Sequence, residues 1–243
     1  MVTKCGERDI NAVPLLNEGI VFYILITIMI SMEIDIMNPY VARITIAARP
    51  VDTINAIAKR IGLSYGWTHK WVNKLAECGV FRTTRMNVYL NEKNTFYQNT
   101  LAYIRRFKDV QFHYEVLQWM GIAYCFTKTD AVYVWTKGGY NIGRNKYYYP
   151  IFIKLKKQDL SLFQFYCKKL NLEYKRKNKV FYNIEVLEDF KFERCDEIPV
   201  DGLDDTIAFM KKYVYNFQPA LEMIQEMYEK QIGVKYKEVI TNV

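Results

Sequence analysis

The chain has 243 residues, of which 51% are hydrophobic and 16% aromatic, and its formal net charge is +8. This length suits one large domain or two of ordinary size, and the composition supplies a core for each. Only two histidines occur, which excludes a histidine-rich metal site. The widely spaced cysteines argue against a disulfide framework or structural zinc and favour reduced thiols in a cytoplasmic protein. They are Cys5, Cys78, Cys125, Cys167 and Cys195.

Residues 1–36 are predicted to form an N-terminal extension that contains an apolar strand or helix. The apolar run 20–32 is too short for a membrane span, which needs roughly 20 such residues. Glu7 and Asp9 argue against a signal peptide. The alternation from Ile24 onward fits a β-strand, although a helix stays open for its first half. An apolar strand with no partner in the chain would be a candidate dimer contact.

Three helices are predicted next, over 39–49, about 53–61 and about 64–78. Apolar residues recur on one side of each helix, and Gly62 permits a sharp turn between the second and the third. Two helices joined by so short a turn make a helix-turn-helix. The helix ends are marked by Asn38, Thr53 and Ser64 as N-caps and by Gly79 as the final stop.

The third helix sorts its residues by face. The inward side is expected to hold Thr68, Trp71, Val72 and Leu75. The outward side holds Gly66, His69, Lys70 and Asn73, and Tyr65 and Trp67 lie at the N-terminus of the helix. The outward side offers hydrogen-bond donors and almost no acid, as a helix that reads base edges in a major groove requires.

A β-hairpin is predicted after this helix, with strands over 80–82 and 87–90. Cationic side chains on this hairpin would contact DNA phosphates, and the expected phosphate-binding residues are Arg82 and Arg85. Lys59 and Arg60 are further candidates. The "INAIAKRIGLS…THKWVNKLAECGVFR" pattern resembles the winged-helix domains of prokaryotic transcription regulators, most closely the archaeal and MarR-like kind. The resemblance covers about 37–90, within a domain predicted over 37–91, and implies double-stranded DNA as the partner.

The charge distribution distinguishes DNA binding from a winged helix used only for protein contacts. Residues 37–108 contain 12 Lys and Arg against 3 Asp and Glu, a net charge of +9. This segment therefore carries the whole cationic excess of the chain. A local surplus of cations attracts a polyanion because binding releases its counterions.

The segment 92–111 is predicted to be a linker helix. A helix over 92–108 would have apolar residues on one side and cations at its C-terminus, where they favour the helix dipole. Such a helix can pack within its own chain, link two domains or pair two subunits. A homodimer is therefore one of the possible arrangements.

Residues 112–243 are predicted to form a second domain of mixed strands and helices. Helix is expected over 113–119, 130–136, 158–170, 204–213 and 219–229. Strands are expected over 123–126, 149–155, 172–175, 179–186 and 191–194. The fold class is therefore α+β, with a winged helix-turn-helix followed by an α/β mixed-sheet domain.

The order of these elements resembles a minimal nucleotidyltransferase domain of the kind found in abortive-infection and toxin–antitoxin proteins. The family's glycine turn corresponds to Thr127 and Lys128, its arginine to Arg144, and its two aspartates to Tyr148 and Pro150. Only the arginine matches. Nucleotidyl transfer needs carboxylates that hold a divalent metal, so the resemblance implies an inactive domain with no cofactor, no metal and no catalytic residues.

Three other motifs have competing interpretations. The glycine loop 138–144 favours a turn over a phosphate cradle, in which Arg144 would assist. The acidic clusters at 185–189 and 201–205 favour a solvated loop and a helix N-terminus over metal ligands. The tyrosines 147–149 could stack on bases or begin a core strand.

These patterns predict a cytoplasmic, archaeal-type regulator that binds double-stranded DNA in a sequence-specific manner and has no membrane partner. Two alternatives remain. One is an antitoxin that represses its own operon and neutralises a cognate toxin, and the other is a nucleotidyltransferase enzyme.

Overall fold

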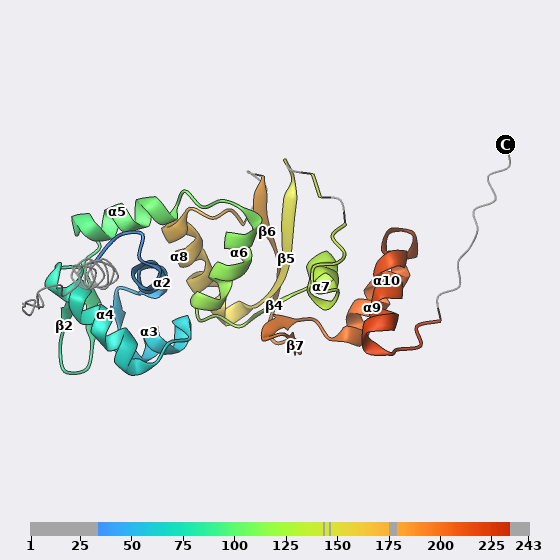
Figure 1. Ribbon diagram of the computed structural model, residues 1–243, viewed down its shortest axis with the longest axis horizontal. Coiled ribbons are helices and arrows are strands. Elements are labelled where there is room, and N and C mark those ends of the chain that lie inside the picture. Colours follow the sequence, from blue (N-terminus) through green and yellow to red (C-terminus); the bar gives the residue numbers. More distant parts are fainter. Residues whose placement is uncertain (1–33, 143, 146, 175–178, 234–243) are drawn as a thin grey trace, which may run out of the picture.

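A computed structural model describes residues 34–142, 144–145, 147–174 and 179–233. The described chain is elongated (Figure 1), with a mainly helical lobe at one end, a β-sheet in the middle and two helices at the other end. The apolar run 20–32, expected to be a strand or helix, lies outside the described residues. No helix in the described part of the chain is long and apolar enough to cross a membrane.

We call residues 34–108 the first lobe. Its elements are α2 (Pro39–Ala47), β1 (Val51–Asp52), α3 (Ile54–Ile61), α4 (Tyr65–Glu77), β2 (Phe81–Thr83), β3 (Val88–Leu90) and α5 (Thr95–Ile104). The three short strands form an antiparallel sheet in the order β1-β3-β2. The expected helix pair and hairpin are therefore present, and α2 ends two residues earlier than its apolar pattern suggested.

Side-chain caps and glycines set the ends of these helices. Asn38, Thr53 and Ser64 each accept hydrogen bonds from free N–H groups in the first turn of α2, α3 and α4. Gly62 and Gly79 adopt positive φ angles of 66° and 72°, where a side chain would be strained. Together these signals fix the short turn between α3 and α4 and the point where α4 gives way to β2.

The core of the first lobe is built from one side of each helix. The four residues expected on the inward side of α4 are all buried, namely Thr68, Trp71, Val72 and Leu75. Helix α5 packs against α2 and buries Tyr97, Thr100, Leu101 and Ile104. The apolar side of the expected linker helix is thus used within the chain, and the helix is shorter than the predicted 92–108.

The second region begins with α6 (Val110–Val116) and the 3-10 turn η1 (Leu117–Trp119). It continues with β4 (Tyr124–Phe126), α7 (Lys128–Trp135), β5 (Tyr149–Lys156), η2 (Lys157–Asp159), α8 (Leu160–Leu170), β6 (Val180–Leu187), β7 (Glu193–Cys195), β8 (Ile198–Val200), α9 (Leu203–Lys212) and α10 (Val214–Tyr228). The sheet order is β6-β5-β4-β8-β7, with β5–β6 and β4–β8 parallel and the other two pairs antiparallel. The chain as a whole is α+β.

Three elements differ from the sequence-based expectation. Residues 172–174 form no strand, and only Glu173 O accepts a backbone hydrogen bond from β6, at Tyr182 N. Strand β8 was not predicted, because it has three residues and contains Pro199. Helix α10 starts at Val214 and includes Pro219, which was expected to begin it.

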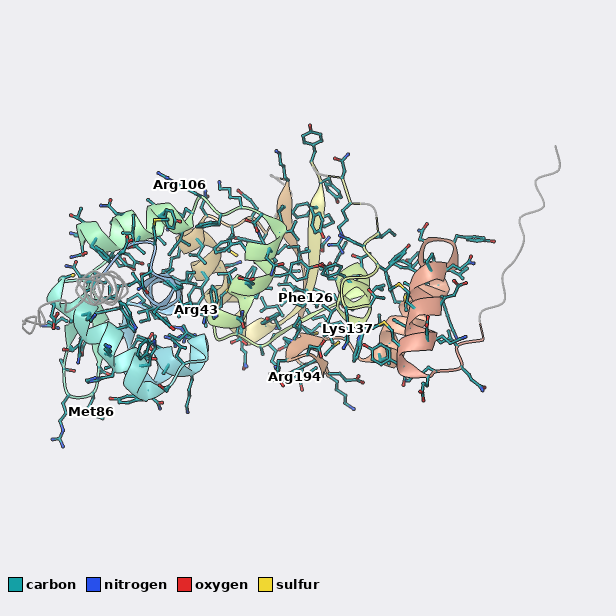
Figure 2. All side chains as sticks on the ribbon, viewed as in Figure 1. Arg43, Met86, Arg106, Phe126, Lys137 and Arg194 are labelled. Carbon is teal, nitrogen blue, oxygen red and sulfur yellow. The ribbon has the colours of Figure 1, made fainter. Side chains whose placement is uncertain are left out.

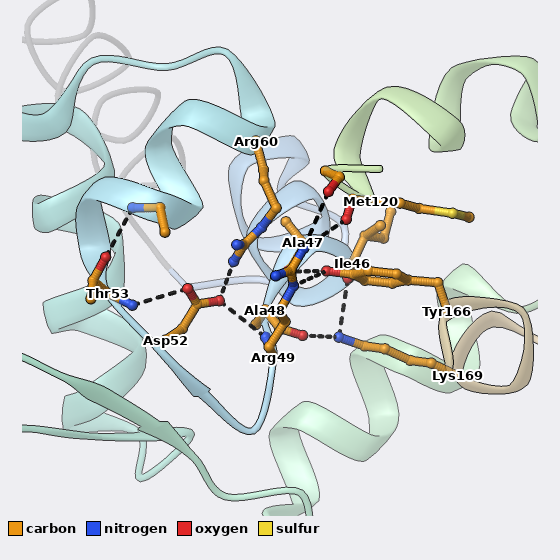
Figure 3. Close-up of polar contacts among 12 residues, drawn as sticks. Ile46, Ala47, Ala48, Arg49, Asp52, Thr53, Arg60, Met120, Tyr166 and Lys169 are labelled. Carbon is orange, nitrogen blue, oxygen red and sulfur yellow. Dashed lines mark hydrogen bonds and ion pairs between the residues drawn. The ribbon is translucent and has the colours of Figure 1, made fainter. Parts of the chain in front are cut away.

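Helix α8 joins the sheet to the first lobe (Figure 3). Tyr166 Oη donates to Ala47 O at 2.8 Å, and Lys169 Nζ donates to Ile46 O and Ala48 O at 3.1 and 2.6 Å. These oxygens belong to the last carbonyls of α2, which have no partner within the helix. The C-terminus of α2 is therefore capped by side chains that come from the second region.

Candidate nucleic-acid interface

Helix α4 and the β2–β3 hairpin lie at the end of the molecule away from the five-stranded sheet (Figure 1), and Met86 projects at the hairpin tip (Figure 2). Met86 is 80% exposed and Tyr65 at the start of α4 is 55% exposed. This surface, which we call the α4–hairpin surface, holds all eight residues that the sequence predicted to contact DNA. They are Tyr65, Gly66, Trp67, His69, Lys70, Asn73, Arg82 and Arg85.

The outward side of α4 is held in place by contacts between neighbouring turns. The rings of Tyr65 and His69 lie 5.8 Å apart, and Asn73 Nδ2 lies 3.3 Å from His69 Nδ1. Gly66 and His69 are exposed, whereas Lys70 and Asn73 are half-buried. A Cβ atom built at Gly66 would meet nothing within 4 Å. The backbone is therefore accessible near the start of α4.

Trp67 contributes to packing as well as to the surface. The residue is 38% exposed, and its ring centroid lies 5.3 Å from that of Tyr40 and 6.4 Å from that of Trp71, edge to face in each case. Lys70 Nζ lies 5.0 Å from the Trp67 ring centroid. A cation over an aromatic face is attracted by the ring's electrons, so Trp67 anchors α4 to α2 and also orients Lys70.

The hairpin turn is closed by side-chain hydrogen bonds and carries two exposed arginines. Asn87 N donates to Thr84 Oγ1 at 3.0 Å, and Thr84 N donates to Asn87 O at 2.8 Å. Arg82 lies over the Tyr89 ring at 4.8 Å, and Arg85 is exposed. Within the described residues, Lys70, Arg82 and Arg85 form no ion pair. Their charge is available to an anionic partner.

Arg60 departs from the sequence-based expectation of phosphate binding. Its side chain is only 9% exposed, and Nη2 pairs with the buried Asp52 carboxylate. Asp52 also accepts from Arg49 N and Thr53 N, so the pair closes the corner between β1 and α3. Arg60 is therefore a structural residue, while Lys59 beside it stays exposed.

Arg144 also has a structural partner in place of a phosphate. Its Nη1 lies 2.9 Å from Asp130 Oδ1, and the two side chains are 5% and 0% exposed. Asp130 further accepts hydrogen bonds from Tyr114 Oη and from Phe152 N. The loop after α7 is thereby fastened to the sheet through a buried ion pair.

The acidic cluster 201–205 was expected at a helix N-terminus, and Asp204 and Asp205 do lie in the first turn of α9, whereas Asp201 precedes the helix and is buried. It is 7% exposed and accepts hydrogen bonds from Thr127 Oγ1 and from Lys154 Nζ, the latter at 2.7 Å. Trp135 Nε1 donates to its backbone oxygen at 2.8 Å. The burial of Asp201 could not be read from the sequence, because its partners Thr127, Trp135 and Lys154 lie far from it along the chain.

The acidic residues of β6 and the loop after it are exposed and paired with lysines. Lys128 pairs with Glu185, Lys157 with Glu188, and Lys156 with Asp189. Across the described ranges, no group of three or more His, Cys, Asp or Glu residues is arranged to hold a metal ion.

Comparison of the chain with protein-family models, curated proteins and solved structures finds no match.

Proposed function

We propose that this chain is a sequence-specific, double-stranded DNA-binding protein that regulates transcription, and that its first lobe is a winged helix. In this proposal α4 lies in the major groove with Lys70 and Asn73 at base edges, and the β2–β3 hairpin follows the phosphate backbone. The observation that carries the proposal is the α4–hairpin surface, where the half-buried donors Lys70 and Asn73 lie beside the exposed His69 on a capped helix. Among the described residues, Lys70, Arg82 and Arg85 of this surface form no ion pair.

The dimensions of the surface fit a duplex. A helix of thirteen residues is about 20 Å long, and a B-DNA major groove is about 12 Å wide and admits one α-helix. Arg82 and Arg85 are exposed on the hairpin, where they would meet the phosphate backbone beside the groove. Contacts with phosphate position a protein on DNA, and contacts with base edges provide its specificity.

We further propose that the second region is catalytically inactive. Support comes from its buried acids, since Asp130 is held by Arg144 and Asp201 by Lys154. A carboxylate that already pairs with a cation is a poor ligand for magnesium, because the metal would have to displace the cation. Turnover of a nucleoside triphosphate with magnesium by the purified chain would contradict this part of the proposal.

The test of DNA binding starts with selection of bound sequences from a random duplex pool. Fluorescence anisotropy titrations would then compare the enriched site with a scrambled duplex. We expect the Lys70→Ala/Asn73→Ala double variant to lose the preference for the enriched site, because each base contact contributes about 1 to 3 kcal/mol of discrimination. A matched control is Lys211→Ala/Asn216→Ala, which removes the same residue types at the other end of the molecule.

The outcome that overturns the proposal is equally specific. A selection that enriches no sequence would remove site-specific binding. Unchanged preference in the double variant would remove α4 as the reading element. Circular dichroism spectra of both variants should match the parent protein, because Lys70 and Asn73 are not part of the core.

A further inference from the structure

A groove with a volume of about 1090 Å³ lies between the first lobe and the second region. The end of α3 with Lys59 to Gly62 borders it on one side, and α6, β4, α7 and the β7–β8 hairpin form the rest. The labelled side chains Phe126, Lys137 and Arg194 mark this side of the sheet in Figure 2. This volume is slightly above the usual range of small-molecule sites, which is about 300 to 1,000 Å³.

Aromatic side chains form the wall of this groove. Tyr124 and Phe126 project from the same side of β4, and Tyr114, Tyr133 and Phe192 lie beside them. Their rings contact one another: the ring centroids of Tyr124 and Phe126 lie 5.7 Å apart, and those of Tyr114 and Tyr133 lie 5.8 Å apart. Phe126 is only 1% exposed and belongs to the core, so the half-buried Tyr114 and Tyr133 and the exposed Phe192 offer the faces and edges on which a planar ring could stack.

The Tyr124 hydroxyl is free to form a hydrogen bond with a ligand in the groove. The residue is only 8% exposed and lines the groove, yet within the described residues its hydroxyl forms no hydrogen bond. Burial raises the pKa of this phenol, and the nearby Arg194 charge opposes that shift. The phenol therefore stays protonated and can donate to a bound anion.

Two cations on the groove complete the set of donors. Arg194 Nη1 donates to Glu197 O at 2.7 Å, which leaves most of its N–H groups free. Lys59 is exposed at the end of α3, and in the described part of the chain neither residue forms an ion pair. Exposed carboxylates of Glu115 and Glu197 also line the groove, which disfavours a polyanion and favours a ligand with one anionic group.

We propose that this groove binds a small organic anion that carries a planar ring system. The ring would lie against Phe192, Tyr114 and Tyr133. The anionic group would accept hydrogen bonds from Tyr124 Oη and the Arg194 guanidinium. Because Lys59 and Gly62 border the same groove, the ligand would contact both the turn before α4 and the sheet. This ligand site does not depend on whether the α4–hairpin surface binds DNA.

The experiment is isothermal titration calorimetry on the full chain with two ring-bearing anions, adenosine monophosphate and indole-3-carboxylate. Adenosine and inorganic phosphate, which provide the ring and the anion separately, serve as comparisons. Tyr124→Phe removes one hydroxyl and Arg194→Gln removes one charge, and each should weaken binding by about tenfold. Matched controls are Tyr215→Phe and Arg106→Gln, which lie on exposed positions away from the groove.

Saturable binding of either probe that weakens in Tyr124→Phe and Arg194→Gln, but not in the two controls, supports the proposal. The probe that binds identifies the source of the anion as a nucleotide or an aromatic carboxylate. Absence of binding by both probes overturns it, and so does binding that neither groove variant weakens. Arg194 is exposed, so the Arg194→Gln variant folds even if loss of the Tyr124 hydroxyl disturbs packing.

Discussion

The two regions of this molecule use their basic residues in opposite ways. Residues 37–108 contain 12 Lys and Arg against 3 Asp and Glu, which leaves 22 against 23 in the rest of the chain. Of the eight ion pairs among described residues, only Arg60 with Asp52 belongs to the first lobe, and seven lie between residues 128 and 230. Ion pairs hold the fold of the second region together, whereas Lys70, Arg82 and Arg85 on the first lobe form none among the described residues and are available to a partner.

The largest expected effect is on the stability of the second region. Replacing Arg144 by Met leaves the fully buried Asp130 carboxylate without its cation, and breaking such a pair costs about 3 to 5 kcal/mol. We expect a urea unfolding midpoint that falls accordingly. The Asp130→Asn/Arg144→Met double variant should lose less, because no charge is left buried, and equal loss in both variants would contradict this explanation.

An intermediate effect is expected on DNA affinity without any change in stability. Removing Arg82 and Arg85 together should weaken duplex binding by roughly tenfold or more and reduce the slope of log affinity against log salt by about 1.8, because each phosphate contact contributes about 0.9. The Lys211→Ala/Lys212→Ala variant removes the same charge from α9 and should change neither quantity. Equal losses of duplex affinity in the two variants would mean that binding depends on the net charge of the protein and not on the hairpin arginines.

A smaller effect concerns Lys169, which links the two regions. Burial lowers its pKa to about 7, below the value near 10.4 of an unfolded lysine. Between these two values the unfolded chain binds more protons than the folded one, so folding stability rises with pH. Glu92, Arg60, Asp52 and Arg105 also act on this pKa.

The measurement for Lys169 is the free energy of unfolding from urea titrations at pH 6.5, 7.5 and 8.5. The parent protein should gain on the order of 1 kcal/mol more than Lys169→Met between the lowest and the highest pH. If the difference in unfolding free energy between the parent protein and Lys169→Met stays constant over this pH range, the pKa of Lys169 is not lowered.

The smallest effect is expected at an exposed ion pair of the second region. Lys157 and Glu188 are 67% and 78% exposed at their side chains, and pairs of this kind contribute under about 1 kcal/mol because water and salt screen them. Lys157→Ala should therefore shift the urea midpoint by no more than the error of the measurement. A loss as large as that of Arg144→Met would show that exposed pairs also stabilise the sheet.

The first lobe could be predicted from sequence because its signals are local. Thr53 and Ser64 cap their helices, Gly62 forms the turn, and the apolar spacing of α4 identifies its buried side. The role of Arg60 could not be predicted, because Asp52 lies eight residues away on a two-residue strand. Hydrophobic spacing alone does not show which cation meets a buried acid.

The second region was harder to predict because its short strands pair with distant ones. Strand β8 pairs in parallel with β4 through Phe126 and Val200, far apart in the sequence. Its hairpin with β7 turns at Asp196 and Glu197, which have φ angles of 47° and 67° without a glycine. Asn-Gly or Asp-Gly is the usual signal for such a turn. The aromatic groove was not predicted either, since it forms only when α3, β4 and this hairpin meet.

The capping of α2 by Tyr166 and Lys169 has a consequence for how the chain can be divided. A fragment that stops at residue 108 would leave the carbonyls of Ile46, Ala47 and Ala48 without these donors. A fragment that starts at residue 109 would leave Tyr166 and Lys169 of α8 without these acceptors. Neither half is complete without the other. The protein should therefore melt in one cooperative transition, and limited proteolysis should release no stable piece of the lobe that carries α4.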